Sequence, residues 1–129
     1  MCTVDVRDCA EAHFKALTVP DAAGKRFVLV EGTHTMGEIA TALREEFNQY
    51  GYKAPKRNMP YFMIQIASIF DSDAGAAKKY WGLNKTFDNS QTKEVLGINF
   101  IPMQQSVVDM GNTLIETGYI QDKKNKGKK

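Results

Sequence analysis

The stretch "FVLVEG", residues 27–32, decides the expected fold of this chain. Its first four residues are all apolar, and no polar residue alternates with them. A continuous apolar run of this length is typical of a strand covered on both faces, as in a parallel sheet with helices on each side. We therefore predict a buried β-strand here and an α/β fold for the chain.

A helical pattern precedes this strand. Asp8 is followed three residues later by Glu11, which resembles a capping box and predicts a helix that runs to Leu17. Helical spacing predicts one buried face on this helix, made of Cys9, Ala10, His13 and Leu17.

A second helical pattern follows the strand. Thr35 and Glu38 have capping-box spacing, and the helix is predicted to end near Tyr50 and Gly51. Its predicted buried face consists of Met36, Ile39, Ala40, Leu43 and Phe47.

Two more helices are predicted in the last third of the chain. Asn89 or Ser90 begins a short helix to Leu96, and Gly97 takes the left-handed conformation after it. Pro102 opens the last helix after a short extended piece. Its predicted buried face is Met103, Val107, Met110 and Leu114, and Gly118 closes it. Between the two halves, "YFMIQIASIF", residues 61–70, is apolar nearly all round and predicts a helix that is buried or roofs a pocket.

Composition limits the class of protein. The 129 residues are 43% hydrophobic and 25% charged, which is typical of one globular domain or part of one. No apolar run approaches the roughly 18 residues of a membrane span, and no signal peptide is visible at the start. Cys2 and Cys9 are too few for a disulfide framework or a zinc site, and free thiols favour a cytoplasmic location.

The positive net charge comes from one end of the chain. Five lysines lie in the last seven residues, and the remainder has 12 basic against 15 acidic residues. We interpret residues 121–129 as a disordered, lysine-rich tail. Because no aromatic residue is interleaved with these lysines, the tail does not indicate nucleic-acid binding.

The predicted strand lacks sheet neighbours in this chain. Apart from Phe27–Val30, only residues 2–6 ("CTVDV") have a weak strand pattern. Backbone groups of a buried strand must be paired, so we infer that part of the sheet is missing from this polypeptide.

Four stretches together resemble the C-terminal part of extended short-chain dehydrogenases/reductases. They are "VDVRDCAEAHFKAL", "GKRFVLVEG", "TMGEIATALREEF" and "FDNSQTKEVLGINFIPMQQSVVDMGNTLIETG". The likeness extends over residues 3–120 and is greatest to the branch of dihydroflavonol and cinnamoyl-CoA reductases. The family's corner motif reads D-N-S-K-x-x-x-x-L-G, and Gln91 replaces its lysine here.

The resemblance implies the C-terminal part of a Rossmann-type fold with a mostly helical substrate-binding lobe. Residues 1–50 would end the Rossmann-type domain as strand, helix, strand and helix, and residues 51–120 would form the substrate lobe. NADP would be the cofactor, a small carbonyl or alcohol compound the substrate, and a missing N-terminal domain the partner.

The family's catalytic and nucleotide-binding motifs are not assigned to residues of this chain. No Gly-rich turn of the G-x-G-x-x-G type follows a strand. Lysine is absent four positions after Tyr50, Tyr61 and Tyr80, and the pair of Tyr119 and Lys123 follows a Gly stop, so it is taken as a chance match to Y-x-x-x-K.

Two functions remain open at this point. The first is the substrate lobe of an NADP-dependent reductase that is inactive alone. The second is a non-catalytic α/β module that binds a partner or a small apolar ligand. The predicted substrate-pocket residues are Tyr61, Phe62, Gln65 and Trp81, chosen by position and residue type, and no metal site is predicted.

Overall fold

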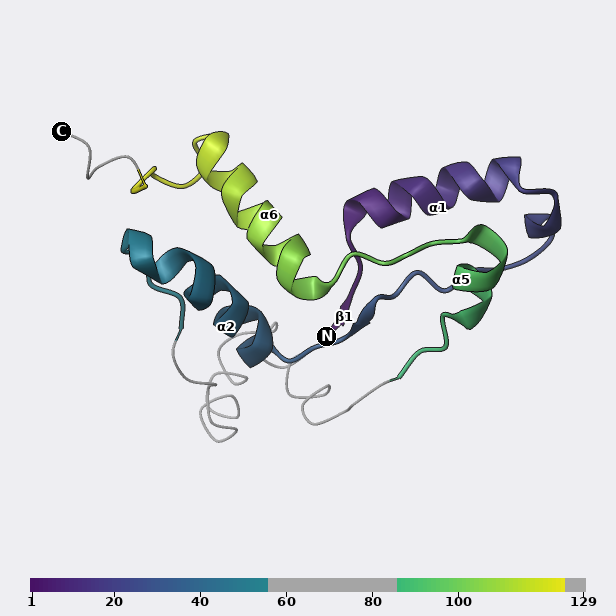
Figure 1. The fold of residues 1–129 in the computed structure, drawn as a ribbon, viewed down its shortest axis with the longest axis horizontal. Coiled ribbons are helices and arrows are strands. Elements are labelled where there is room, and N and C mark those ends of the chain that lie inside the picture. Colours follow the sequence, from purple (N-terminus) through teal and green to yellow (C-terminus); the bar gives the residue numbers. More distant parts are fainter. Residues whose placement is uncertain (56–85, 125–129) are drawn as a thin grey trace, which may run out of the picture.

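The computed structural model describes residues 1–55 and 86–124 of the chain, drawn in colour in Figure 1. Within these ranges the elements are, in order, β1 (Cys2–Thr3), α1 (Val6–Thr18), η1 (Pro20–Ala22), β2 (Gly32–Thr33), α2 (Met36–Phe47), η2 (Asn48–Tyr50), α5 (Ser90–Leu96) and α6 (Met103–Glu116). The strands β1 and β2 pair antiparallel, with Cys2 opposite Thr33. This part of the chain is therefore α/β, as predicted, with a very small sheet.

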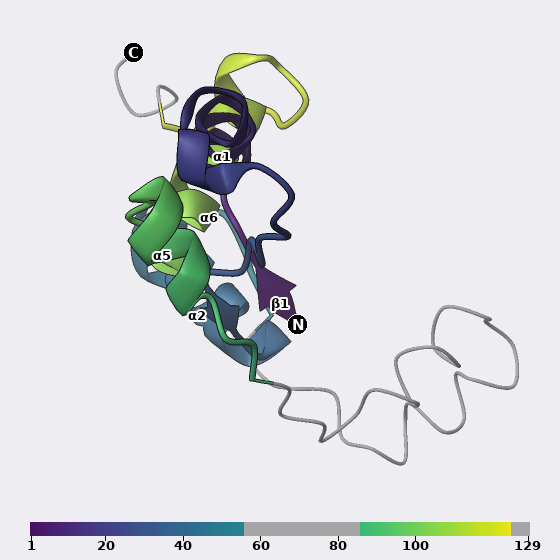
Figure 2. The same cartoon turned by 90° about the vertical axis from the view of Figure 1, so that its right-hand side faces the viewer.

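The helices form two groups at opposite ends of an elongated molecule (Figure 1). At one end α1 and η1 pack with α5 around Ala12, Ala22, Leu96 and Ile98. At the other end α2 packs on α6 around Ala42, Met103 and Val107. The small sheet and two extended segments connect the groups (Figure 1). Figure 2 looks along the long axis from the end that carries α1 and α5. In the described part of the chain, no helix has the length and apolar character needed to span a membrane.

The start of α1 differs from the prediction. The N-cap is Asp5, whose carboxylate accepts the backbone N–H of Arg7 at 2.8 Å, and the helix begins at Val6. Asp8 lies in the first turn and is 3% exposed. Asp5 competes better for the cap because its side chain also binds the guanidinium of Arg7. The predicted strand at residues 2–6 is correspondingly limited to Cys2–Thr3.

The predicted buried face of α1 is also wrong. Ala10, His13 and Leu17 are exposed, and Cys9 is only half-buried. The opposite side of the helix, through Asp8 and Ala12, packs on the rest of the molecule. The predicted residues do share one side of the helix, but nothing among the described residues covers that side.

The predicted strand at residues 27–32 is not a paired strand in this structure. Only Gly32 and Thr33 pair with β1, and Phe27–Glu31 crosses the molecule without forming a helix or ladder. Val28 is 39% exposed, whereas Phe27 and Leu29 pack against the core of the α1 group. The physical reason is that a ladder needs a second strand, and the described residues provide one only at the end of this segment.

The predicted helix ends are mostly confirmed. Thr35 and Glu38 form a reciprocal capping box at the start of α2, and Gly51 is left-handed, with a φ of 81°. Gly97 is left-handed with a φ of 60°, and α6 begins directly after Pro102. On α6 the predicted face is wrong at Met110, which is 53% exposed.

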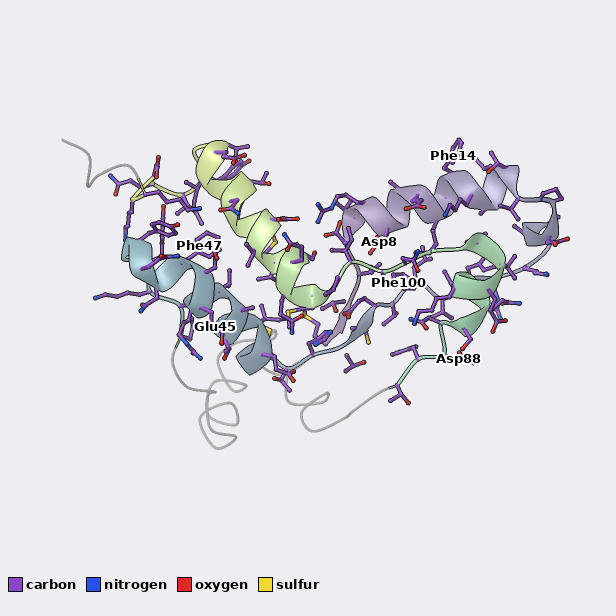
Figure 3. The ribbon with its side chains drawn as sticks, viewed as in Figure 1. Asp8, Phe14, Glu45, Phe47, Asp88 and Phe100 are labelled. Atoms are coloured by element: carbon purple, nitrogen blue, oxygen red, sulfur yellow. The ribbon has the colours of Figure 1, made fainter. Side chains whose placement is uncertain are left out.

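Gly111, rather than the predicted Met110, lies in the contact between α2 and α6. A Cβ atom on Gly111 would lie 2.7 Å from ring atoms of Phe47. The glycine therefore lets the buried Phe47 ring lie directly against the backbone of α6, between the two helices in Figure 3.

Candidate functional site

The backbone of residues 27–30 is bonded along one edge only. The Thr92 side chain donates to the Val28 carbonyl at 2.8 Å, and the Asn89 side chain donates to the Val30 carbonyl at 2.7 Å. Carbonyls two residues apart that point to the same side indicate an extended backbone. The polar side chains of α5 and its cap thus act as a substitute for a neighbouring strand. These two hydrogen bonds give the polar residues Asn89 and Thr92 of the corner motif a structural role.

The opposite edge of this segment is open in the described structure. Glu31 donates its N–H to the Thr3 carbonyl at 2.8 Å, so β1 covers the far end of this edge. No hydrogen bond within residues 1–55 and 86–124 involves the backbone of Phe27 or Leu29. We call these two residues the open edge. Unpaired backbone groups next to a hydrophobic core are typical of a position that another strand fills.

The exposed side of α1 is apolar. Val6 is 78% exposed, Phe14 is 67% exposed and Leu17 is 88% exposed. Ala10 and His13 lie on the same side of the helix by spacing, and we call this set of five residues the outer face of α1. Figure 3 shows Phe14 pointing away from the rest of the molecule. Within residues 1–55 and 86–124 nothing covers this face, and an apolar face of this extent is typical of a surface that contacts another part of a protein.

An ion-pair network holds the start of α1 against α6. The Arg7 guanidinium lies 2.8 Å from Asp5 and 2.7 Å from Asp109. The side-chain hydrogen bonds from Arg7, aided by Ser106, hold the pKa of the Asp5 carboxyl far below its usual range, although burial opposes this. The same two carboxylates raise the pKa of Arg7. This network joins the two helix groups.

Asp8 makes a second connection of this kind. Its carboxylate accepts the backbone N–H of Ile101 at 2.9 Å, and Asp8 points toward the segment that leads into α6 (Figure 3). Of the two acidic residues of "VDVRD", Asp5 caps α1 and binds Arg7, and Asp8 holds the chain between α5 and α6 in place.

An acid–base pair follows the open edge. His34 Nε2 lies 2.7 Å from Glu31 Oε2, and the Thr3 hydroxyl donates to the same oxygen at 3.3 Å. In open α/β sheets ligands bind at the carboxyl ends of the strands, which is where this pair lies relative to residues 27–30. Sequence reasoning missed the pair, although "EGTH" directly after an apolar strand contains it.

The starts of α1 and α2 do not fit the pyrophosphate of a dinucleotide. Phosphate groups bind at helix N-termini that present free N–H groups. At α1 that position holds the carboxylates of Asp5 and Asp8, and at α2 Glu38 closes a capping box. Negative charge at both helix starts repels a pyrophosphate, so we derive no step through a nucleotide from this structure.

One additional tyrosine and lysine pair has the Y-x-x-x-K spacing, namely Tyr52 and Lys56. Lys56 lies outside the described residues. Tyr52 follows the left-handed Gly51 and is not on a helix, and its hydroxyl donates to the Gln121 carbonyl at 3.0 Å. Tyr119 is not helical either, and it is 85% exposed. The Y-x-x-x-K arrangement places tyrosine and lysine on one face of a helix, and neither Tyr52 nor Tyr119 lies on a helix.

The predicted pocket residues Tyr61, Phe62, Gln65 and Trp81 all lie outside the described residues, as does the stretch at residues 61–70. The structure therefore does not test them. Within the ranges that the structure describes, no group of three or more His, Cys, Asp or Glu side chains could hold a metal ion.

Comparisons with known proteins place this chain beside oxidoreductases. It is 32% identical over 113 residues to the ketoreductase azaE of Aspergillus niger. It is 30% identical over 106 residues to a putative NADPH-dependent methylglyoxal reductase, GRP2, of Candida albicans. It is 26% identical over 113 residues to the NADPH-dependent methylglyoxal reductase GRE2 of Saccharomyces cerevisiae.

These matches cover most of this chain and little of each relative. They include 82% to 88% of this chain but only 27% to 29% of the relatives. No protein-family model matches the chain. The chain is thus an oxidoreductase-like region that spans less than a third of the length of these curated relatives.

Proposed function

We propose that this chain forms the C-terminal, substrate-binding portion of an NADPH-dependent carbonyl reductase of the extended short-chain dehydrogenase/reductase type, in the branch of dihydroflavonol and cinnamoyl-CoA reductases. Residues 1–50 end the Rossmann-type domain and residues 51–120 belong to the substrate lobe. The substrate is a small ketone or aldehyde. The sequence predicts a disordered lysine-rich tail over residues 121–129, but its first residues are bonded to the rest of the molecule, through Gln121 and Lys123 to Tyr52 and through Lys124 to Asn112.

The observation that carries this proposal is the outer face of α1. A helix between two strands of a parallel sheet packs on that sheet and has neighbouring helices or strands beside it. Here Phe14 and Leu17 are exposed while the opposite side of the same helix is packed. The open edge at Phe27 and Leu29 supports the same conclusion, because a parallel strand there would satisfy its backbone groups.

The nucleotide would be bound outside this chain. The starts of α1 and α2 carry carboxylates, which disfavour a pyrophosphate at these two positions. The relatives named as NADPH-dependent are more than three times as long as the matched region. NADPH therefore enters the proposal as the cofactor of a larger assembly, and the predicted pocket residues Tyr61, Phe62, Gln65 and Trp81 remain part of the proposal.

The test combines the 129-residue chain with the part of the Aspergillus niger relative that this chain does not match. NADPH consumption is followed by absorbance with methylglyoxal as a probe carbonyl. We expect the 129-residue chain alone neither to bind nor to oxidise NADPH, and the mixture to do both.

Tight, saturable NADPH binding by the 129-residue chain alone would contradict the proposal. A chain that is monomeric, soluble and cooperatively folded, and that shows no affinity for the complementary part, would instead favour the alternative, a non-catalytic α/β interaction module.

A further inference from the structure

A cluster of aromatic rings lies at the end of α2, where the chain turns back. Phe47 is 5% exposed, and its ring meets the Tyr52 ring edge-on with centroids 6.0 Å apart. Tyr50 lies on the intervening η2 turn. The three rings come from six consecutive residues because α2 ends in a tight 3-10 turn closed by the left-handed Gly51.

The chain returns to this cluster after α6. Residues 119–124, which we call the strap, pass over it. The Tyr52 hydroxyl accepts the Lys123 N–H at 2.9 Å, and the Ile120 N–H bonds to the Leu114 carbonyl at 3.0 Å. The strap is thus bound at defined points.

One ammonium group is enclosed by this arrangement. Lys124 Nζ lies 4.9 Å from the centroid of the Tyr50 ring and 5.1 Å from that of Phe47. It also donates a hydrogen bond to the Asn112 side-chain oxygen at 2.6 Å. Cations within about 6 Å of an aromatic face are attracted by the ring quadrupole, and two rings with an amide oxygen form a set of contacts specific for an N–H-bearing cation.

The surroundings also favour positive charge. Lys124 borders an open hollow of about 450 Å³ that Glu116 and Asp122 line as well. Carboxylates at a hollow raise the local concentration of cations.

We propose that Phe47, Tyr50 and Asn112 form a binding site for a small primary alkylammonium ion, and that Lys124 of the same chain fills this site in the present structure. A free alkylamine competes with Lys124, so binding of the amine releases the strap. The site is independent of the nucleotide and of the proposed reductase activity.

The first test uses n-butylammonium, which reproduces the end of a lysine side chain. Binding to the 129-residue chain is followed by NMR shifts of the Tyr50 ring. In Lys124→Gln the competing ammonium is absent, and we expect affinity to rise about tenfold. Lys124→Arg keeps the charge and serves as the control, with affinity like that of the wild type. Equal affinity in Lys124→Gln and wild type would overturn the proposal.

Two further comparisons test the composition of the site. Tetramethylammonium has no N–H to donate to Asn112, so we expect it to bind several-fold more weakly than n-butylammonium to Lys124→Gln. Adding Tyr50→Leu to Lys124→Gln removes one ring and lowers the affinity for n-butylammonium about fivefold. Unchanged binding in either comparison would overturn the assignment.

The second measurement needs no ligand. Hydrogen exchange at the Ile120 and Lys123 amides reports strap attachment, because both amides are bonded in this structure. We expect at least about threefold faster exchange in Lys124→Gln and wild-type rates in Lys124→Arg. Wild-type rates in both variants would contradict the role of Lys124.

Discussion

Buried polar side chains hold the described part of this chain together at the scale of single residues. Thr92 is fully buried, at 0% exposed, and its hydroxyl donates a hydrogen bond to the Val28 carbonyl. In the same way, the Asp8 carboxylate accepts a hydrogen bond from the Ile101 N–H. Each satisfies a backbone group that a sheet neighbour or water would otherwise satisfy.

Thr92→Val tests this role without changing the shape of the side chain. The carbonyl of Val28 would lose its partner, so we expect the free energy of unfolding to fall by about 1 to 2 kcal/mol. Urea unfolding followed by circular dichroism measures the change. Thr113→Val is the matched control, because Thr113 is exposed and bonds only within its own helix. An equal effect of the two substitutions would count against the contact.

The lowered pKa of Asp5 predicts that the free energy of unfolding depends on pH. Because its folded pKa lies far below the ordinary value, its contribution to stability is present above about pH 5 and is lost as the pH falls below about 4. Asp5→Asn keeps a capping side chain but cannot be ionised.

The measurement is urea unfolding of wild type and Asp5→Asn at pH 7 and pH 3. Between these values we expect the wild type to lose about 1 kcal/mol more than the variant. If the free energy of unfolding falls equally in the wild type and in Asp5→Asn, the ion pair with Arg7 contributes no stability.

At the scale of elements, helix ends were more predictable than helix faces. Capping residues and left-handed glycines act locally, so the box at Thr35 and Glu38 and the stop at Gly97 could be read from the sequence. Faces depend on what lies opposite. Gly111, and not the predicted Met110, lies in the contact between α2 and α6, because the Phe47 ring needs the space that a side chain would fill. No local sequence pattern indicates this.

The sequence pattern on α1 and at residues 27–30 indicated burial that the described residues do not provide. The stretch Phe27–Val30 reads as a covered strand, and Leu17 reads as a core residue, yet Val28 and Leu17 are exposed. An apolar pattern reports the environment in the complete fold and cannot say whether that environment is present in one chain. The acid–base pair of Glu31 and His34 was missed for another reason, since only the turn after the segment brings them together.

Leu17→Glu tests the outer face of α1 as an element. Leu17 is 88% exposed, so we expect the stability of the chain alone to change by less than about 0.5 kcal/mol. Binding of the hydrophobic dye ANS should decrease, because the apolar surface is interrupted.

Ala12→Glu is the control for this prediction on the opposite side of α1. Ala12 is 2% exposed, so a buried carboxylate there is expected to cost more than about 3 kcal/mol. Comparable destabilisation by both substitutions would mean that the outer face is covered within this chain.

At the scale of the whole molecule, the described part of the chain is a set of helices around a sheet of two short strands. Its two helix groups are joined by the network of Asp5, Arg7 and Asp109 and by the segment that Asp8 fixes. Its matches reach only about 28% of the length of a relative such as the Aspergillus niger ketoreductase. Under the proposed function, the open edge and the outer face of α1 are the two places where we expect the rest of a reductase to attach.

Hydrogen exchange of the 129-residue chain, with and without the unmatched part of the Aspergillus niger relative, tests this account most directly. We predict a one-to-one complex in which the Phe27 and Leu29 amides become at least about a hundredfold slower to exchange, and which Leu17→Glu prevents. If both parts are folded and the two amides exchange at the same rate in the mixture as in the chain alone, the account is contradicted.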